Sequence, residues 1–76
     1  METWTIGYIK TDNLDEKYFI EVFAKVPFEA YRNGWEMATI IEKLPHEQLM
    51  LVVINVGTIE ENKKRFKIKE ESIKMK

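Results

Sequence analysis

A basic segment near the C-terminus has the residue types and spacing best suited to binding a charged ligand. It interleaves Phe66 and Ile68 with the basic residues Lys63, Lys64, Arg65, Lys67 and Lys69. Basic side chains contact phosphate groups, and exposed aromatic rings stack on nucleic-acid bases. The segment therefore admits a nucleic-acid-binding surface, with Phe19 and Phe23 as the stacking platform. The alternative, which we favour, is an edge strand whose lysines discourage edge-to-edge aggregation.

The charge of the chain is divided between two regions. Residues 1–62 hold eleven acidic and five basic residues, a net charge of −6, whereas residues 63–76 hold seven basic and two acidic residues, a net charge of +5. The acidic region would repel nucleic acid, and arginine, which reads phosphates and bases better than lysine, is scarce. The division favours a protein partner that the charged regions orient or steer, with nucleic acid as the alternative partner.

Residues suited to catalysis or metal binding are few. The chain has one histidine, His46, one serine, Ser72, and no cysteine. No sequence context joins these residues to an acid in a Ser–His–acid triad. The acidic segment 12–16 lacks the alternate ligands, central glycine and distal glutamate of a calcium loop. We therefore predict no catalytic, cofactor-binding or metal-binding residue, and a protein that is not an enzyme.

The hydrophobic pattern predicts four elements before residue 57. Alternating residues indicate strands over 4–10 and 17–26, joined by a turn segment. Pro27 suits the first position of a helix, and polar residues at helical spacing predict a helix over 27–44. The apolar run 48–56 predicts a strand that is covered on both faces.

Residues 58–70 carry two competing patterns. Thr58 and Glu61 match a helix-capping box, whereas the alternation of basic and apolar residues over 64–70 is typical of a strand. We favour the strand, which gives the order ββαββ; the helix would give ββαβα. Either order predicts a small α+β domain with one helix packed on an antiparallel-rich sheet. We assign this single domain to residues 1–70 and expect 71–76 to be a frayed basic tail.

The predicted elements carry more apolar surface than one helix can cover. The helix 27–44 is apolar over more than half its circumference, and a surface helix needs a stripe of about 100°. Phe19 and Phe23 would point to the second face of the sheet, opposite this helix. One interpretation is that a compact core uses all of these residues, with the terminal segment folded across the open face. The alternative, which we favour, is a contact with another chain, since exposed apolar patches mark protein contacts and twofold dimers are the commonest oligomers. We therefore expect a homodimeric protein-interaction module of accessory, regulatory or inhibitory type, whose partner-binding residues are Phe19, Phe23, Tyr31 and Trp35.

The composition also bears on location. A chain without cysteine is compatible with a reducing compartment. The first residues lack the basic and apolar regions of a signal peptide. The longest apolar run, 49–54, has six residues, and a membrane helix needs roughly 20. We expect a cytoplasmic protein that does not enter a membrane.

Overall fold

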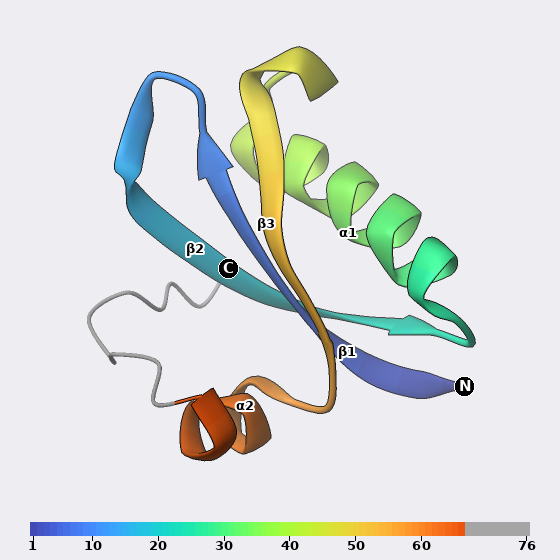
Figure 1. Cartoon of the computed structure of the whole chain (residues 1–76). Coiled ribbons are helices and arrows are strands. Elements are labelled where there is room, and N and C mark those ends of the chain that lie inside the picture. The colour runs from blue at the N-terminus through green and yellow to red at the C-terminus, as the bar shows by residue number, and fades with distance from the viewer. Residues whose placement is uncertain (67–76) are drawn as a thin grey trace.

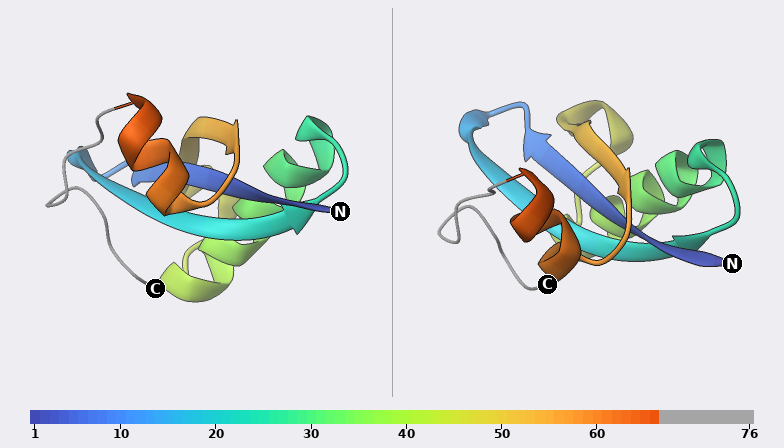
Figure 2. Two further views of the ribbon diagram at one scale, coloured as in Figure 1. Left: turned by 90° about the horizontal axis from the view of Figure 1, so that it is seen from below. Right: turned by 60° about the horizontal axis from the view of Figure 1, so that its bottom comes forward.

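The described part of the chain forms a three-stranded antiparallel sheet with a helix on each face (Figures 1 and 2). The computed structural model describes residues 1–66. Across the sheet the strand order is β2-β1-β3, so that β1 is central and β2 and β3 are the edges. The elements in chain order are β1 (Glu2–Lys10), β2 (Asn13–Ala24), α1 (Pro27–Glu42), the 3₁₀ turn η1 (His46–Gln48), β3 (Leu49–Val56) and α2 (Ile59–Phe66).

This architecture confirms the predicted α+β class and selects the ββαβα order. The favoured strand over 64–70 is wrong at 64–66, where the chain is helical, and 67–70 lies outside the described residues, as does the expected tail 71–76. The helix predicted over 27–44 ends at Glu42, because Lys43 adopts the left-handed conformation (φ 57°, ψ 42°). Such a residue commonly terminates a helix.

Helix α2 forms because its first turn is capped from several sides. The N–H of Glu61 donates to Thr58 Oγ1 at 3.1 Å, and the N–H of Thr58 donates to Glu61 Oε1 at 2.9 Å. This is the reciprocal capping box that the sequence contained. Glu21 of β2 adds a third bond, accepting the N–H of Ile59 at 2.8 Å. These bonds satisfy backbone N–H groups at the start of the helix. A strand over the same residues would not present the N–H of Ile59 to Glu21, so the helical pattern prevails.

The core lies between α1 and the sheet. The inward side of α1 is made of small residues, Ala30, Gly34 and Ala38, all buried. A Cβ at Gly34 would lie 2.8 Å from Ile6 Cγ1, which is closer than real contacts allow. The helix therefore tolerates a central glycine, despite its cost of about 1 kcal/mol relative to alanine, because that glycine lets α1 approach the central strand.

The second face of the sheet, opposite α1, is partly covered by α2 (Figure 2). Ile59 is buried there, and Asn62 Nδ2 donates to Thr5 Oγ1 at 3.0 Å. Phe19 is also buried on this face, opposite Gly7 in the strand register. A Cβ on Gly7 would meet the Phe19 ring at 2.9 Å, so glycine makes room for the aromatic side chain.

No helix within residues 1–66 is long and apolar enough to cross a membrane.

Candidate interaction surface

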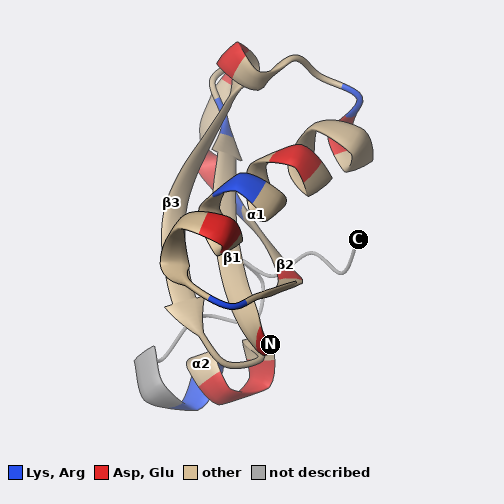
Figure 3. Cartoon of the chain, turned by 90° about the vertical axis from the view of Figure 1, so that its right-hand side faces the viewer, with Lys and Arg blue, Asp and Glu red and all other residues tan. Residues whose placement is uncertain are grey.

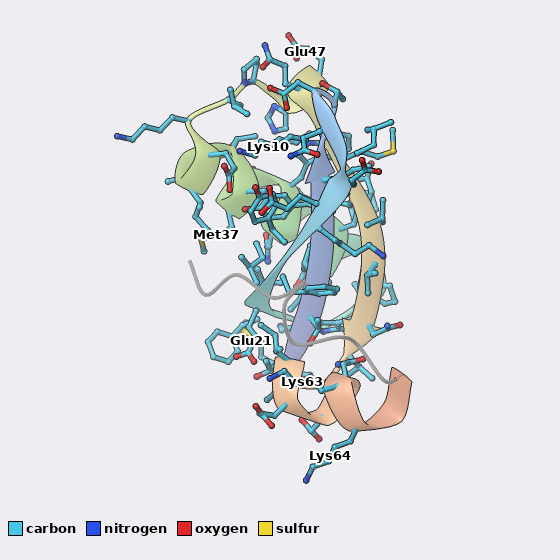
Figure 4. The ribbon with its side chains drawn as sticks, turned by 90° about the vertical axis from the view of Figure 1, so that its left-hand side faces the viewer. Lys10, Glu21, Met37, Glu47, Lys63 and Lys64 are labelled. Atoms are coloured by element: carbon cyan, nitrogen blue, oxygen red, sulfur yellow. The ribbon has the colours of Figure 1, made fainter. Side chains whose placement is uncertain are left out.

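A groove runs between the outer edge of β2 and one flank of α1. Its volume is about 410 Å³. Figure 4 shows Met37 projecting from α1 on one side of β2, while Glu21 points toward α2 on the other. We call this surface the β2–α1 groove, and its lining residues are Glu21, Val22, Phe23, Asn33, Glu36, Met37 and Ile40.

Three large apolar side chains in the β2–α1 groove are exposed to solvent. Ile40 is 71% exposed, Phe23 67% and Met37 42%. They come from two elements, since Phe23 lies next to the last residue of β2 and the other two lie about one helical turn apart on α1. Scattered apolar residues are normal on protein surfaces, but a contiguous set around a groove is typical of a contact site.

The edge of β2 beside the groove presents backbone groups that β1 does not use. Thr3 lies opposite Phe23, and its carbonyl accepts the N–H of Gly57 at 2.7 Å on the β3 side. The pair Thr3–Phe23 is therefore not hydrogen-bonded across β1 and β2. Because pairs alternate along an antiparallel ladder, the same holds for the pairs of Glu21 and Phe19. The N–H and C=O groups of these β2 residues point outward from the sheet.

Asn33 occupies one of these outward groups. Its Nδ2 donates to the carbonyl of Phe23 at 3.0 Å, which ties α1 to the end of β2. Just beyond it, the N–H of Lys25 donates to Glu29 Oε1 at 3.0 Å. Among residues 1–66, the edge is thus closed by α1 from Phe23 onward and open before it.

The other edge of the sheet is interrupted. The register between β1 and β3 shifts after Gly7, which pairs with Val53, while Tyr8 pairs with Leu51. Val52 is the extra residue of this bulge. Bulges at an edge twist the strand and hinder pairing with another chain. Of the two edges, β2 therefore offers the longer regular stretch for a partner strand.

The structure separates the four residues that the sequence assigned to partner binding. Phe19 is only 2% exposed and belongs to the interior, whereas Phe23 lies in the groove. Tyr31 is 39% exposed, but it lies with Trp35 on the opposite flank of α1, ring edge against ring face at 5.2 Å. Trp35 Nε1 donates to the carbonyl of His46 at 3.2 Å and so fixes α1 to the turn before β3. Their role in binding remains a prediction.

The sequence pattern missed which flank of α1 would be exposed beside β2. Met37 and Ile40 belong to the apolar excess of the helix, but periodicity alone does not show which part of that excess meets the sheet. Asn33 carried no signal at all. Its role depends on the carbonyl of Phe23, ten residues earlier, pointing out of the sheet.

The basic residues that the structure describes do not form the predicted strand. Lys63, Lys64 and Arg65 lie on α2, and Lys67 and Lys69 lie outside the described residues. Figure 3 shows acidic residues at the start of α2 and basic residues after them. Lys63 Nζ lies 3.5 Å from Glu60 Oε1. The expected stacking platform also loses one member, because Phe19 is buried.

A partly buried polar cluster ties α1 to the hairpin of β1 and β2. Tyr8 donates its hydroxyl hydrogen to Glu42 Oε2 at 2.6 Å, and Lys10 Nζ lies 3.3 Å from Glu42 Oε1. Burial raises the pKa of the Tyr8 hydroxyl far above its ordinary value of about 10, and the bond to Glu42 raises it further. The same carboxylate raises the pKa of Lys10.

Tyr18 completes this cluster. Its ring stacks on that of Tyr8 with centroids 5.5 Å apart, and Lys10 Nζ lies 5.2 Å from its centroid. A hydrogen bond with Glu16 raises the pKa of Tyr18, and burial adds to the rise. Every polar group of the cluster is engaged with another, an arrangement suited to holding α1 in place.

The residues considered for catalysis are not gathered into a site. His46 is exposed, and its ring packs against Trp35 with centroids 5.7 Å apart. Ser72 lies outside the described residues. Within residues 1–66, no group of three His, Cys, Asp or Glu side chains is placed to hold a metal ion.

Comparison with protein families, with curated proteins and with solved structures found no match.

Proposed function

We propose that this protein is a non-enzymatic protein-interaction module that acts as a homodimer, and that the β2–α1 groove with the open edge of β2 forms its contact surface. The observation that carries the proposal is the exposure of Phe23, Met37 and Ile40 around one groove. This groove lies directly beside a strand edge whose outward backbone groups are not used by β1. A partner strand at this edge would supply hydrogen bonds, and the groove would supply apolar contacts.

The energetics support a second chain at this surface. Burying one large aliphatic or aromatic side chain stabilises by about 1.5–3 kcal/mol, and three such side chains are exposed in the groove. A chain of 76 residues has a small core, and small domains often depend on association for stability. The chain has no cysteine for a disulfide, and association is one of the ways in which such small domains gain stability.

The polar groups support a binding role rather than a catalytic one. Tyr8, Lys10 and Glu42 bind one another through a hydrogen bond and an ion pair, contacts suited to a structural role. Their arrangement stabilises α1, which in turn shapes the groove. We place this module in the cytoplasm, since a cysteine-free chain suits a reducing compartment, and assign it an accessory, regulatory or inhibitory role.

The test is the mass of the protein in solution as a function of concentration, measured by sedimentation equilibrium. We expect a reversible dimer for the wild type. Ile40→Glu should shift it to monomer, because a charge would be buried in the contact. Phe28→Glu is the matched control, since Phe28 is also 71% exposed on α1 but lies outside the groove.

Two results would refute the proposal. One is a wild-type protein that stays monomeric at all accessible concentrations. The other is a dimer that Phe28→Glu dissociates while Ile40→Glu leaves it intact. Circular dichroism of each variant is the control that checks whether the fold is retained.

A further inference from the structure

We infer that two copies of this chain pair along their β2 edges in antiparallel orientation, about a twofold axis at Phe19, so that Lys17 of each copy faces Glu21 of the other. The two sheets would then join into one of six strands. This inference rests on the proposed homodimer and specifies its geometry.

The usable length of the edge follows from what closes it at each end. Toward the C-terminus, Asn33 occupies the carbonyl of Phe23. Toward the N-terminus, the register shifts after Ile9, which pairs with Lys17, while Lys10 pairs with Asn13. The regular open stretch therefore begins at Lys17 and ends before Phe23.

The alternation of hydrogen-bonded and non-hydrogen-bonded pairs along β1 and β2 decides which residues in this stretch can pair with a partner strand. The pairs formed with β1 by Phe19 and Glu21 are not hydrogen-bonded, and Lys17, two residues before Phe19, follows the same alternation. These three residues carry the outward N–H and C=O groups. A twofold pairing that uses all three, and no others, places Phe19 opposite itself and Lys17 opposite Glu21.

The charges favour this register over its neighbours. With the axis at Phe19, two Lys17–Glu21 pairs form, each of opposite sign. An axis at Glu21 would set the two Glu21 carboxylates opposite each other and Lys17 opposite Lys25, and like charges directly opposite are destabilising. An axis at Ile20 would pair Phe19 with Glu21 and would set Lys17 opposite Phe23, whose carbonyl Asn33 already holds.

The groove and Glu21 both fit this arrangement. Met37 and Ile40 flank β2 beside Glu21, and the residue opposite Glu21 in the second copy is Lys17. Residues directly opposite in an antiparallel pair point to the same face. The ammonium group of that lysine therefore meets the Glu21 carboxylate on the α2 side of the sheet, while Met37 and Ile40 line the same edge on the α1 side. Glu21 uses Oε2 for the N–H of Ile59, which leaves Oε1 for an intermolecular bond.

A charge exchange tests the register. Lys17→Glu places four carboxylates at the two pairs, and Glu21→Lys places four ammonium groups there. Each variant alone should raise the dimer dissociation constant by about tenfold or more. An equimolar mixture of the two should form heterodimers with near wild-type affinity, because every facing pair is again of opposite sign. Lys25→Glu is the control and should have little effect.

A distance measurement supports the charge exchange and does not depend on Glu21, whose replacement also removes the acceptor of Ile59. A spin label on Lys25→Cys is unambiguous, since the chain has no other cysteine. With the axis at Phe19, the two labels are twelve residues apart along the strand direction, about 40 Å, whereas an axis at Glu21 gives eight residues, about 27 Å.

The outcomes separate this inference from the proposed function. A dimer that Ile40→Glu dissociates, but that survives both charge reversals or shows about 27 Å between labels, would overturn the register and leave the homodimer standing. A monomeric wild type would overturn both. Near wild-type affinity in the mixture of the two charge-reversal variants, together with a distance of about 40 Å between the labels at Lys25→Cys, would support both.

Discussion

The side chain of Asn33 on α1 donates to the backbone carbonyl of Phe23 on β2 at 3.0 Å. This bond joins the two walls of the β2–α1 groove and closes the strand edge at that point. Helix and edge strand are thus fixed relative to each other in the monomer, so a partner would meet a preformed surface and lose less free energy to ordering it.

Removing this bond should loosen one end of the edge. We expect Asn33→Ala to lower the free energy of unfolding by about 0.5–1.5 kcal/mol, the usual net value of one hydrogen bond. Urea denaturation in an Ile40→Glu background measures this without a contribution from association. In the otherwise wild-type dimer, the freed carbonyl should also admit other registers and broaden the distance distribution at Lys25→Cys. An unchanged distribution would show that Asn33 does not limit the register.

Gly34→Ala should destabilise the protein although alanine is the better helix former. The gain in helix propensity is about 1 kcal/mol, but the new methyl group would lie 2.8 Å from Ile6 Cγ1 and Cγ2. Overpacking of this kind costs about 1–3 kcal/mol, so we expect a net loss. A double-mutant cycle with Ile6→Ala checks the cause by urea denaturation. If the two changes are additive, the close approach of Ile6 is not the reason.

Thr58→Ala should remove one half of the capping box of α2. The hydroxyl accepts the N–H of Glu61 at 3.1 Å, and loss of such a cap costs about 0.5–2 kcal/mol. Thr11→Ala is the control, because the Thr11 hydroxyl is exposed and its one hydrogen bond, to the carbonyl of Gln48, is long at 3.5 Å. Thermal unfolding followed by circular dichroism compares the two. Equal effects would mean that the cap does not stabilise α2.

Stability should fall at high pH because of the buried cluster around Glu42. The pKa values of Tyr8 and Lys10 are both raised in the folded protein. Both groups are therefore protonated in the folded state at a pH where the unfolded chain has already lost those protons. Their contribution is present below a pH of about 10 and is lost as the pH rises above it. The free energy of unfolding, measured from pH 8 to pH 11, should decline.

Tyr8→Phe isolates one part of this decline. It removes a hydrogen bond to a carboxylate and should cost about 1.5–3 kcal/mol at neutral pH, while the dependence of stability on alkaline pH becomes shallower. Tyr31→Phe is the control, since Tyr31 lies near the start of α1, packs on Trp35 and is outside this cluster. A decline of the same slope in Tyr8→Phe and the wild type would show that Tyr8 does not contribute to it.

The sequence predicted most of the fold because most elements depend on local patterns. Three local patterns were enough for most elements: the alternation in β2, the proline at the start of α1 and the apolar run of β3. Each reflects contacts between near neighbours or the division between buried and exposed side chains. The C-terminal segment was different, since its strand and helix patterns were both present. The choice between them involves Glu21, which caps Ile59 from 38 positions earlier in the chain.

The candidate surface was only partly predictable because it also depends on contacts between residues that are far apart in the sequence. The sequence indicated an apolar excess and identified Phe23, but it treated Phe19 as equivalent because both point to the second face. Phe19 is buried because Gly7 lies opposite it in β1 and leaves room for its ring. The bond from Tyr8 to Glu42 joins residues 34 positions apart, and no local pattern reveals such a pair.

Hydrogen exchange at the backbone amides of Phe19 and Glu21 tests the central claim most directly. Both N–H groups point outward from β2 in the monomer, and a second copy would hold them in hydrogen bonds. Measured by NMR above the dimer dissociation constant, these two amides should be protected in the wild type and in Phe28→Glu, and should exchange rapidly in Ile40→Glu. Rapid exchange of both amides in a wild-type protein that sediments as a dimer would contradict pairing through β2.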